Sequence, residues 1–415
     1  MRPVVEPGPE LTRAQLQRYS RHILLGPIGR DGQRRLLHAR VAVVGAGGLG
    51  APVIQYLAAA GIGRLTVIDD DVVEASNLQR QVIHSQATLG RPKATSAAEA
   101  ASSLNPDVTV TARQVRLEQA NATELLGGHD LVIDGTDNFP TRYLISDVCA
   151  ELGLPVVWGS ILRFDAQVSV FWAGEAAEPQ VTLRDLFPHP PDEGTTPSCG
   201  EAGVLGAMCG QVGSVMATEA IKLLTGAGQT LLGRILVLDA LTQRWREIPL
   251  QPPAAPRDER SRGAFAADPP PKARIVEDPP AEVPAIDVLE LQRRLAARDR
   301  SGPSTVLIDV REAPEREIAV IPGAVHVPLE EILRAPAAAI GHVLDEAERD
   351  EAERTKAERD EAGHDGPPEV LVHCRSGQRS ARAVVALRAA GIPAVTVTGG
   401  ILAWGEQIDP TLARY

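Results

Sequence analysis

Short apolar runs alternate with helical patterns over residues 40–250, and this alternation predicts a largely parallel α/β sheet. The runs expected to form strands are residues 41–44, 65–69, 108–112, 130–134 and 155–158, followed by 167–172 and 234–239 as an antiparallel extension. Helical spacing covers residues 49–60 and 212–224, and Thr225-Gly226 supplies a stop signal for the second helix.

A second, smaller α/β unit is predicted to follow. Apolar runs at residues 305–309, 370–373 and 394–398 indicate its strands, and residues 382–390 indicate a helix. Between the two units, residues 251–284 hold nine prolines and no hydrophobic periodicity, which is typical of a linker. We therefore expect one domain at residues 11–250, a proline-rich linker at 251–284 and a second domain at 285–415. The charged stretch 345–361 has i,i+4 pairs such as Asp345 and Arg349, so we interpret it as a solvated helix and assign it no function.

Composition narrows the class of protein. The 415 residues fit two or three domains, and the net charge of −12 argues against nucleic-acid binding, which needs a basic face. No apolar run approaches the ~18 residues of a membrane span, and the first 20 residues lack an apolar core of the kind that signal peptides have. Four cysteines make no disulfide framework and suit thiol chemistry. We expect a cytoplasmic protein that does not associate with membranes.

Cys374 lies where a predicted strand turns into a helix, within the run HCRSGQRS at residues 373–380. Backbone N–H groups of the turn, the helix dipole and the guanidinium groups of Arg375 and Arg379 should all favour a thiolate, with a pKa below roughly 8.5. Four residues separate Cys374 from Arg379, one fewer than in the Cys-x5-Arg phosphate loop of cysteine phosphatases. The shorter loop suits a terminal sulfur anion, so we expect Cys374 to carry a persulfide. The alternative is a structural cysteine buried before a helix.

A glycine loop follows the first predicted strand. Gly45, Gly47, Gly48 and Gly50 permit a tight turn and a close backbone approach to phosphate at a helix N-terminus. Asp69, at the end of the next predicted strand, is placed to bind a ribose. Taken alone, this pattern fits NAD, FAD or ATP.

Charged residues after the loop favour a triphosphate. Asn77, Arg80 and Lys93 could add an amide and two cations beside the phosphates, which a dinucleotide would not require. Residues 134–138 end the fourth predicted strand, where open α/β sheets bind ligands, and an acid there could hold Mg²⁺.

At this point the chain resembles known families. Residues 18–250 resemble the ubiquitin-activating-enzyme-like adenylyltransferases of the ThiF/MoeB family, which have a Rossmann-like fold. The matching segments are residues 18–21, 45–50, 76–81, 90–93, 136–138 and 197–204. Residues 285–415 resemble a rhodanese domain through residues 309–312, 321–324, the Cys374 loop and 399–404. The domain order is that of the MoeZ/MoeBR-type adenylyltransferase/sulfurtransferases.

The resemblance implies roles for individual residues. It places Gly45, Gly47 and Gly50 in the nucleotide loop, Asp69 on the ribose, Asn77, Arg80 and Lys93 on the triphosphate of ATP, and Asp137 on Mg²⁺. Arg21 matches an arginine that reaches the nucleotide from a neighbouring subunit, which implies a homodimer. Cys199 matches a cysteine that forms a covalent link to the carrier in some relatives, although it could also be a passive loop cysteine. Cys149 and Cys209 lie in apolar or glycine-rich surroundings and are interpreted as structural.

The chain departs from the family at the zinc site. Family members commonly bind structural zinc through two C-x-x-C pairs, but residues 182–185 here are Thr-Leu-Arg-Asp, and the region from residue 251 to the next domain has no cysteine. We therefore expect no structural zinc.

These expectations combine into one hypothesis. The first domain adenylates the C-terminal glycine of a small ubiquitin-like sulfur-carrier protein ending in Gly-Gly, and Cys374 then supplies sulfur to make a thiocarboxylate, with Arg379 assisting. The sulfur would come from a cysteine desulfurase or thiosulfate. A Rossmann NAD or FAD oxidoreductase fused to a persulfide-binding module, and a non-catalytic sulfur-carrier scaffold, are the alternatives. The pathway served (molybdopterin, thiamine, cysteine or tRNA thiolation) is left open by the sequence.

Overall fold

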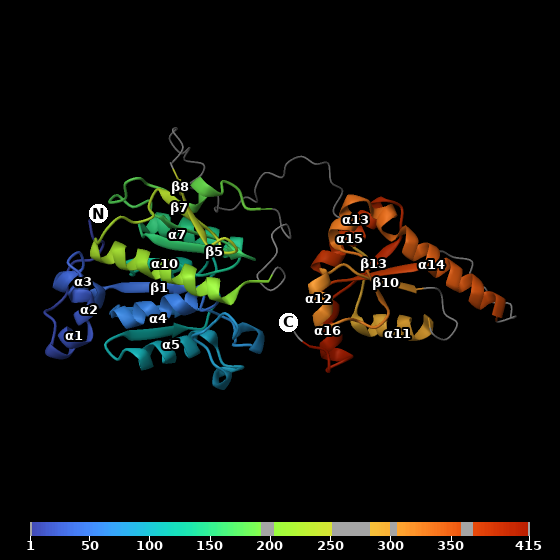
Figure 1. The fold of residues 1–415 in the computed structure, drawn as a ribbon, viewed down its shortest axis with the longest axis horizontal. Helices are drawn as coiled ribbons and strands as arrows, with labels where there is room; N and C mark the ends of the chain where they lie inside the picture. Colours follow the sequence, from blue (N-terminus) through green and yellow to red (C-terminus); the bar gives the residue numbers. More distant parts are fainter. Residues whose placement is uncertain (1, 192–202, 251–282, 299–304, 358–367, 414–415) are drawn as a thin grey trace. The chain divides into compact units, whose positions relative to one another are not determined.

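The computed structural model describes residues 2–191, 203–250, 283–298, 305–357 and 368–413. The chain divides into two compact units, Met1–Arg262 and Gly263–Tyr415 (Figure 1). Both are α/β structures, which confirms the predicted fold class. Most of the expected linker, residues 251–282, lies outside the described residues.

The first unit is built on one sheet with helices on both faces. Its strands are β1 Arg40–Val44, β2 Arg64–Ile68, β3 Thr109–Arg113, β4 Leu131–Asp134, β5 Val156–Leu162, β6 Asp165–Phe171, β7 Arg234–Asp239 and β8 Arg244–Pro249. Its described helices are α1 Arg13–Arg18, α2 Ser20–Ile23, α3 Gly29–His38, α4 Gly50–Ala60, η1 Ala75–Asn77, η2 Gln86–Thr88, α5 Lys93–Leu104, α6 Ala122–Leu126, α7 Phe139–Leu152, α8 Leu183–Leu186 and α10 Gly206–Thr225.

The strand order of this sheet is β3-β2-β1-β4-β5-β6-β7-β8. Neighbouring strands pair in parallel from β3 through β2, β1 and β4 to β5, and antiparallel from β5 through β6 and β7 to β8. The expected antiparallel extension is therefore present, and the parallel part places the ends of β1 and β4 side by side.

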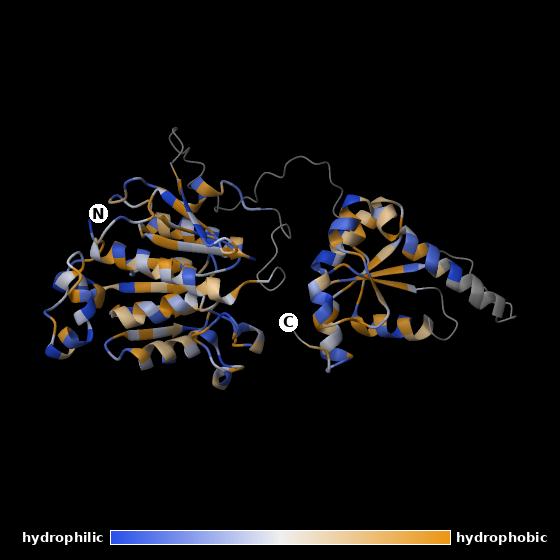
Figure 2. Ribbon diagram, viewed as in Figure 1, coloured by the Kyte–Doolittle hydropathy of each residue, from blue (hydrophilic) through white to orange (hydrophobic). Residues whose placement is uncertain are grey.

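Alternate residues of β1 enter different cores. Val41 and Val43 pack with α3, α4, α5 and α10, whereas Ala42 and Val44 pack with α6 and α7. A strand buried on both faces needs an uninterrupted apolar sequence, which is why this run predicts a strand so clearly. Each fully buried valine contributes about 1.5–3 kcal/mol to the stability of the sheet. Figure 2 shows the hydrophobic residues concentrated along these strands.

The second unit is a five-stranded parallel sheet of order β11-β10-β12-β13-β9. The strands are β9 Ala285–Ile286, β10 Thr305–Asp309, β11 Ala324–His326, β12 Glu369–His373 and β13 Ala394–Val397. The helices are α11 Val288–Arg298, α12 Ala313–Ile318, α13 Leu329–Arg334, α14 Pro336–Ala357, α15 Gln378–Ala389 and α16 Gly400–Gln407. Helices α13, α14 and α15 share a core on one face, and α11 and α16 share a core on the other.

Three strands were not expected from the sequence. All six residues of β8 are exposed, so they show no buried run, while β9 and β11 are only two and three residues long. Helix α15 begins at Gln378, four residues before the predicted start, because polar residues of the Cys374 loop form its first turn. Within the described residues, no helix is long and apolar enough to cross a membrane.

Candidate active site

The glycine loop connects the end of β1 to the start of α4, as predicted. Gly45 has a φ of +90°, which a residue with a side chain rarely adopts. A Cβ atom on Gly50 would lie 1.9 Å from the carbonyl oxygen of Gly45, so the turn closes only without one. The result is a tight loop that leads into a helix N-terminus, a geometry suited to phosphate.

The loop after β4 lies against the glycine loop. A Cβ atom on Gly45 would be 2.9 Å from the carbonyl oxygen of Gly135. The chain leaves β1 through α4 to reach β2 on one side of β1, whereas β4 pairs with the other side of β1. The loops that follow β1 and β4 therefore lead the chain in opposite directions along the sheet. Open α/β sheets bind ligands at such a switch point.

Asp69 is joined to the glycine loop. Its Oδ2 accepts a hydrogen bond from the backbone N–H of Ala46 at 2.7 Å, and its Oδ1 accepts one from Asp71 N–H at 2.9 Å. Burial raises the pKa of the Asp69 carboxyl, and these hydrogen bonds act against that shift. Asp69 is therefore positioned beside the loop where the sequence predicted a ribose ligand.

Two of the predicted cations lie near this loop region. Lys93 is buried at the start of α5, and its Nζ lies 2.8 Å from Asp71 Oδ2. The side chain of Arg80 runs past Gly48, since a Cβ atom there would be 3.7 Å from Arg80 Cδ. Arg80 Nη1 donates to the carbonyl oxygen of Ser76 at 3.1 Å. Asn77 is buried, and its Oδ1 accepts from Glu74 N–H at 3.2 Å, so this oxygen fixes the local turn.

The acids after β4 differ in environment. Asp134 is buried and accepts hydrogen bonds from the N–H and hydroxyl of Thr136 at 3.0 and 2.7 Å. Burial raises the pKa of the Asp134 carboxyl. Asp137 is exposed in the same loop and open to a ligand. The group of three neighbouring carboxylates found in the described part of the chain is Asp69, Asp70 and Asp71, and it does not include Asp137.

Sequence reasoning missed two buried polar residues beside the glycine loop. His84 contacts the carbonyl oxygen of Ala46 through Nε2 at 3.0 Å and the hydroxyl of Ser96 through Nδ1 at 2.9 Å. Burial lowers the pKa of His84. Gln81 is buried, and its Oε1 has no hydrogen-bond partner in the described part of the chain. Gln81 belongs to the segment 76–81 already singled out, but nothing in the sequence around His84 indicates its contact.

Other predicted residues lie apart from the loop or outside the described residues. Arg21 is exposed on α2, and no hydrogen bond or ion pair within the described ranges links it to the glycine loop. Cys199 is outside the described residues. Cys149 and Cys209 are buried, and burial raises the pKa of the Cys149 thiol. Cys209 packs against the glycine loop, because a Cβ atom on Gly48 would lie 2.9 Å from its Sγ.

Residues 182–185, where the resemblance led us to look for a cysteine pair, begin the short helix α8 Leu183–Leu186. Thr182 caps the short helix α8, and Asp185 accepts hydrogen bonds from the N–H and hydroxyl of Thr182 at 2.7 and 3.1 Å. This helix turn offers no thiolate.

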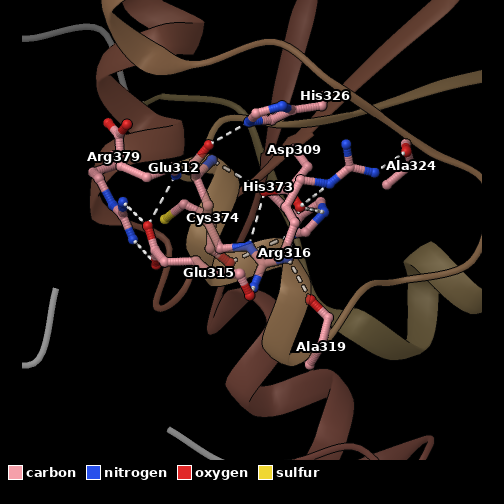
Figure 3. Close-up of polar contacts among 11 residues, drawn as sticks. Asp309, Glu312, Glu315, Arg316, Ala319, Ala324, His326, His373, Cys374 and Arg379 are labelled. Atoms are coloured by element: carbon pink, nitrogen blue, oxygen red, sulfur yellow. Dashed lines mark hydrogen bonds and ion pairs between the residues drawn. The ribbon is translucent and has the colours of Figure 1, made fainter. Parts of the chain in front are cut away.

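Cys374 follows β12 at the entrance to α15 (Figure 3). The residue is only 1% exposed. Its Sγ accepts hydrogen bonds from the backbone N–H of Gly377 at 3.1 Å and from the hydroxyl of Ser380 at 3.6 Å. Gly377 adopts a φ of +104°, which allows the loop to turn back under the sulfur. The loop therefore places two hydrogen-bond donors at the sulfur.

Arg379 pairs with a carboxylate that the sequence reasoning missed. Its Nη1 and Nη2 lie 2.6 and 2.7 Å from the two carboxylate oxygens of Glu315 on α12 (Figure 3). Arg379 therefore shares its charge with Glu315, and its expected role at Cys374 stays a prediction.

A buried ionic network continues from Glu315. Arg311 and Asp309 are both 0% exposed, and Arg311 Nη2 lies 2.6 Å from Asp309 Oδ2. Arg311 also donates to the carbonyl oxygens of Glu315 and Ala319 at 3.3 and 2.8 Å. His373 is buried with its Nε2 3.7 Å from Asp309 Oδ2, and burial lowers the pKa of His373 to about 4. The Cys374 loop thus rests on charged side chains held away from water.

Comparisons with known proteins match both units of the chain. The ThiF family matches residues 19–259, and the rhodanese-like domain matches residues 289–407. A probable adenylyltransferase/sulfurtransferase MoeZ from Mycobacterium tuberculosis is 43% identical over 421 residues, covering 100% of this chain and 98% of that protein. A sulfur carrier protein adenylyltransferase from Thermus thermophilus is 50% identical over 238 residues, covering 57% of this chain and 88% of that protein.

A solved structure of Escherichia coli MccB is similar with a TM-score of 0.51 at 18% identity, covering 57% of this chain and 72% of that one, and supports the fold alone. The family matches confirm both predicted resemblances. The chain therefore belongs to the ThiF family and, through its rhodanese-like domain, to the two-domain adenylyltransferase/sulfurtransferases.

Proposed function

We propose that this protein uses ATP to adenylate the C-terminal glycine of a small ubiquitin-like sulfur-carrier protein and then transfers sulfur from Cys374 to make the carrier's thiocarboxylate. The observation that carries the proposal is that one chain joins a phosphate-type glycine loop at a sheet switch point to a cysteine whose Sγ accepts hydrogen bonds from Gly377 and Ser380. The curated relatives named above carry the corresponding names.

The adenylation step depends on holding ATP in a fixed position beside the glycine loop. A carboxylate oxygen of the carrier attacks the α-phosphorus of ATP, and pyrophosphate leaves with the electron pair. Backbone N–H groups at the start of α4 would bind the phosphates, while Lys93 and Arg80 would stabilise charge on the departing pyrophosphate. Asp69 would hold the ribose next to the loop to which it is hydrogen-bonded.

Mg²⁺ fits the oxygen donors of this site. The exposed carboxylate of Asp137 follows Thr136, whose backbone nitrogen would be 3.4 Å from a Cβ atom on Gly45, so the loop is close to the phosphate-binding turn. Mg²⁺ accepts one or two carboxylates together with phosphate oxygens and water. When bound, the ion would neutralise charge on the phosphates, and Asp137 would hold it.

Sulfur transfer follows from the environment of Cys374. Its thiolate would take the outer sulfur of a donor such as a cysteine desulfurase persulfide or thiosulfate. The resulting persulfide anion then attacks the acyl-adenylate carbonyl, and AMP leaves. A second thiol attacks Cys374 Sγ, which releases the thiocarboxylate and leaves a disulfide for a cellular thiol to reduce. Cys199 is our candidate for that second thiol on the basis of its motif. The buried free thiols suit a reducing cytoplasm.

We also propose a homodimer. Arg21 lies on α2, and the next exposed apolar side chains, Leu24 and Leu25, are 73% and 52% exposed. Contact with a second copy would cover these leucines and could bring Arg21 to the partner's nucleotide. Light scattering of the purified protein tests this, and a strictly monomeric mass at micromolar concentration would contradict it.

The decisive experiment mixes the protein with Mg-ATP, a sulfur donor and each candidate carrier, followed by intact mass measurement of the carrier. We expect a 16 Da increase for one carrier, which identifies the pathway served. Cys374→Ala should abolish the increase but retain carrier-dependent ATP–pyrophosphate exchange, whereas Lys93→Ala should lose the exchange. Absence of exchange with every carrier would reject the adenylation step. Wild-type thiocarboxylate yield from Cys374→Ala would reject the role of Cys374.

A further inference from the structure

The carboxylate of Glu315 holds the arginine of the Cys374 loop. Both of its oxygens accept from Arg379, and Oε2 also accepts from the backbone N–H of Glu312 at 3.0 Å. The Glu315 side chain is 9% exposed and that of Arg379 is 16% exposed. A forked, poorly solvated pair of this kind is far stronger than a pair at the surface.

Arg379 belongs to the same turn as the reacting sulfur. The donors to Cys374 Sγ come from Gly377 and Ser380, which lie on either side of Arg379 along the chain. Figure 3 draws Cys374 together with the Arg379–Glu315 pair. Arg379 is therefore anchored within the sulfur-binding turn, while Glu315 is attached to a different helix, 64 residues away in sequence.

The pairing changes which sulfur donors the loop should accept. Thiosulfate is a dianion whose sulfonate oxygens match the fork of a guanidinium. In this structure both terminal nitrogens of Arg379 already donate to a carboxylate, whose negative charge offsets the attraction of the guanidinium for an anionic donor. A persulfide on a cysteine side chain carries its charge only on sulfur. The pairing of Arg379 with Glu315 should therefore weaken its binding less than the binding of thiosulfate.

We propose that Glu315 is a specificity-determining residue that occupies Arg379 and thereby directs Cys374 towards cysteine persulfide donors and away from thiosulfate. The inference rests on the proposed sulfurtransferase function and names the class of donor. Glu315 acts through Arg379 and is a positioning residue.

The two loading reactions balance in the same way. With thiosulfate, the Cys374 thiolate attacks the outer sulfur, the S–S bond of thiosulfate breaks, and sulfite leaves with the electron pair. With an alkyl persulfide, the same attack forms the Cys374 persulfide and releases the alkyl thiolate. Neither reaction needs an oxidant, a reductant, ATP or a carrier protein.

The test compares both donors on the full chain, with cyanide as acceptor and thiocyanate as product. One donor is thiosulfate, and the other is the persulfide of N-acetylcysteine methyl ester, whose only charge is on sulfur. For Glu315→Gln we expect the ratio of kcat/KM for thiosulfate to that for the persulfide to rise roughly tenfold, mainly through a lower KM for thiosulfate. The gain should shrink as ionic strength increases, because it is electrostatic.

Three further variants separate specificity from simple structural damage. Glu317→Gln removes the same charge from an exposed position on α12 and should leave the ratio unchanged. Glu315→Asp shortens the side chain by one methylene and should give an intermediate ratio. This variant provides the test if Glu315→Gln fails to fold. Adding Arg379→Gln to Glu315→Gln should remove the gain.

An equal loss with both donors, a ratio that does not change in either Glu315 variant, or a gain that persists without Arg379 would overturn the inference. Because the assay omits ATP and carrier, such a result would leave the adenylation step and carrier thiocarboxylate formation to be judged separately by the mass measurement above.

Discussion

His84 donates through Nε2 to the carbonyl oxygen of Ala46 at 3.0 Å, so a buried imidazole is fixed to the middle of the glycine loop. A carbonyl oxygen only accepts, so Nε2 carries the proton and Nδ1 accepts from Ser96 at 2.9 Å. The nucleotide loop is thus held by a side chain from outside its own motif.

Replacing this imidazole should weaken the nucleotide site. We expect His84→Ala to lower the free energy of unfolding by about 1–3 kcal/mol, since two buried polar groups lose their partners. The affinity for ATP should fall roughly tenfold as the loop loosens. Calorimetric titration and denaturant unfolding measure the two effects. His38→Ala removes an exposed imidazole bonded to the backbone of Glu6 and should leave ATP affinity unchanged; equal effects of the two variants would contradict the role of His84.

Two glycine substitutions should have opposite consequences. A methyl group on Gly50 would clash with the backbone of Gly45, so Gly50→Ala should abolish ATP binding measured with a fluorescent analogue. Gly210 lies inside α10 with open space around its Cα, so Gly210→Ala should keep ATP binding and stabilise the unit by up to about 1 kcal/mol. Normal ATP affinity in Gly50→Ala would show that the loop accommodates a methyl group at this position, contrary to the clash expected from the structure.

Acid should weaken the second unit. The folded pKa of His373 is lowered to about 4 by burial, against an ordinary value near 6.5. The unfolded chain therefore binds a proton first as pH falls, and stability present above pH 6.5 is lost progressively towards pH 4, by on the order of 3 kcal/mol. Hydrogen exchange of peptides from residues 368–413 across this range measures the loss. His373→Gln should flatten the dependence, and an unaltered slope would assign it to other groups.

The stability losses from the two partners of the buried ion pair should not add. Arg311→Met leaves Asp309 buried with less compensation, and we expect a loss of about 3–5 kcal/mol. Asp309→Asn should cost a comparable amount, whereas the double variant should lose clearly less than the sum. Denaturant unfolding of the four proteins completes the cycle. Strict additivity would mean that the two side chains do not depend on each other.

The sequence was informative where one local pattern determines the structure. The double-sided burial of β1 requires an unbroken apolar run, and the glycine loop requires Gly45 and Gly50 for steric reasons. Each of the seven runs expected as strands in residues 40–250 forms a strand, although β5 continues four residues further than expected. The order of motifs was sufficient to identify the family.

The sequence was silent where contacts join distant segments. Nothing near Glu315 predicts that it meets Arg379, and nothing near His84 predicts its contact with Ala46. Both are polar side chains that find a partner only after helices have packed. Strand β8, with every residue exposed, has no burial pattern from which it could be recognised.

The separation of 64 residues between Glu315 and Arg379 has a consequence for how the protein matures. Helix α12 follows β10 and α15 follows β12, so the pair can form only after these two strands are aligned. Contacts between such distant segments form late in folding because they carry a large loop-closure cost. A chain emerging from the ribosome would thus expose Cys374 without the hydrogen bonds from Gly377 and Ser380 until α15 has docked. Sulfur loading is then restricted to molecules that have finished folding, and nascent chains would not collect sulfane sulfur.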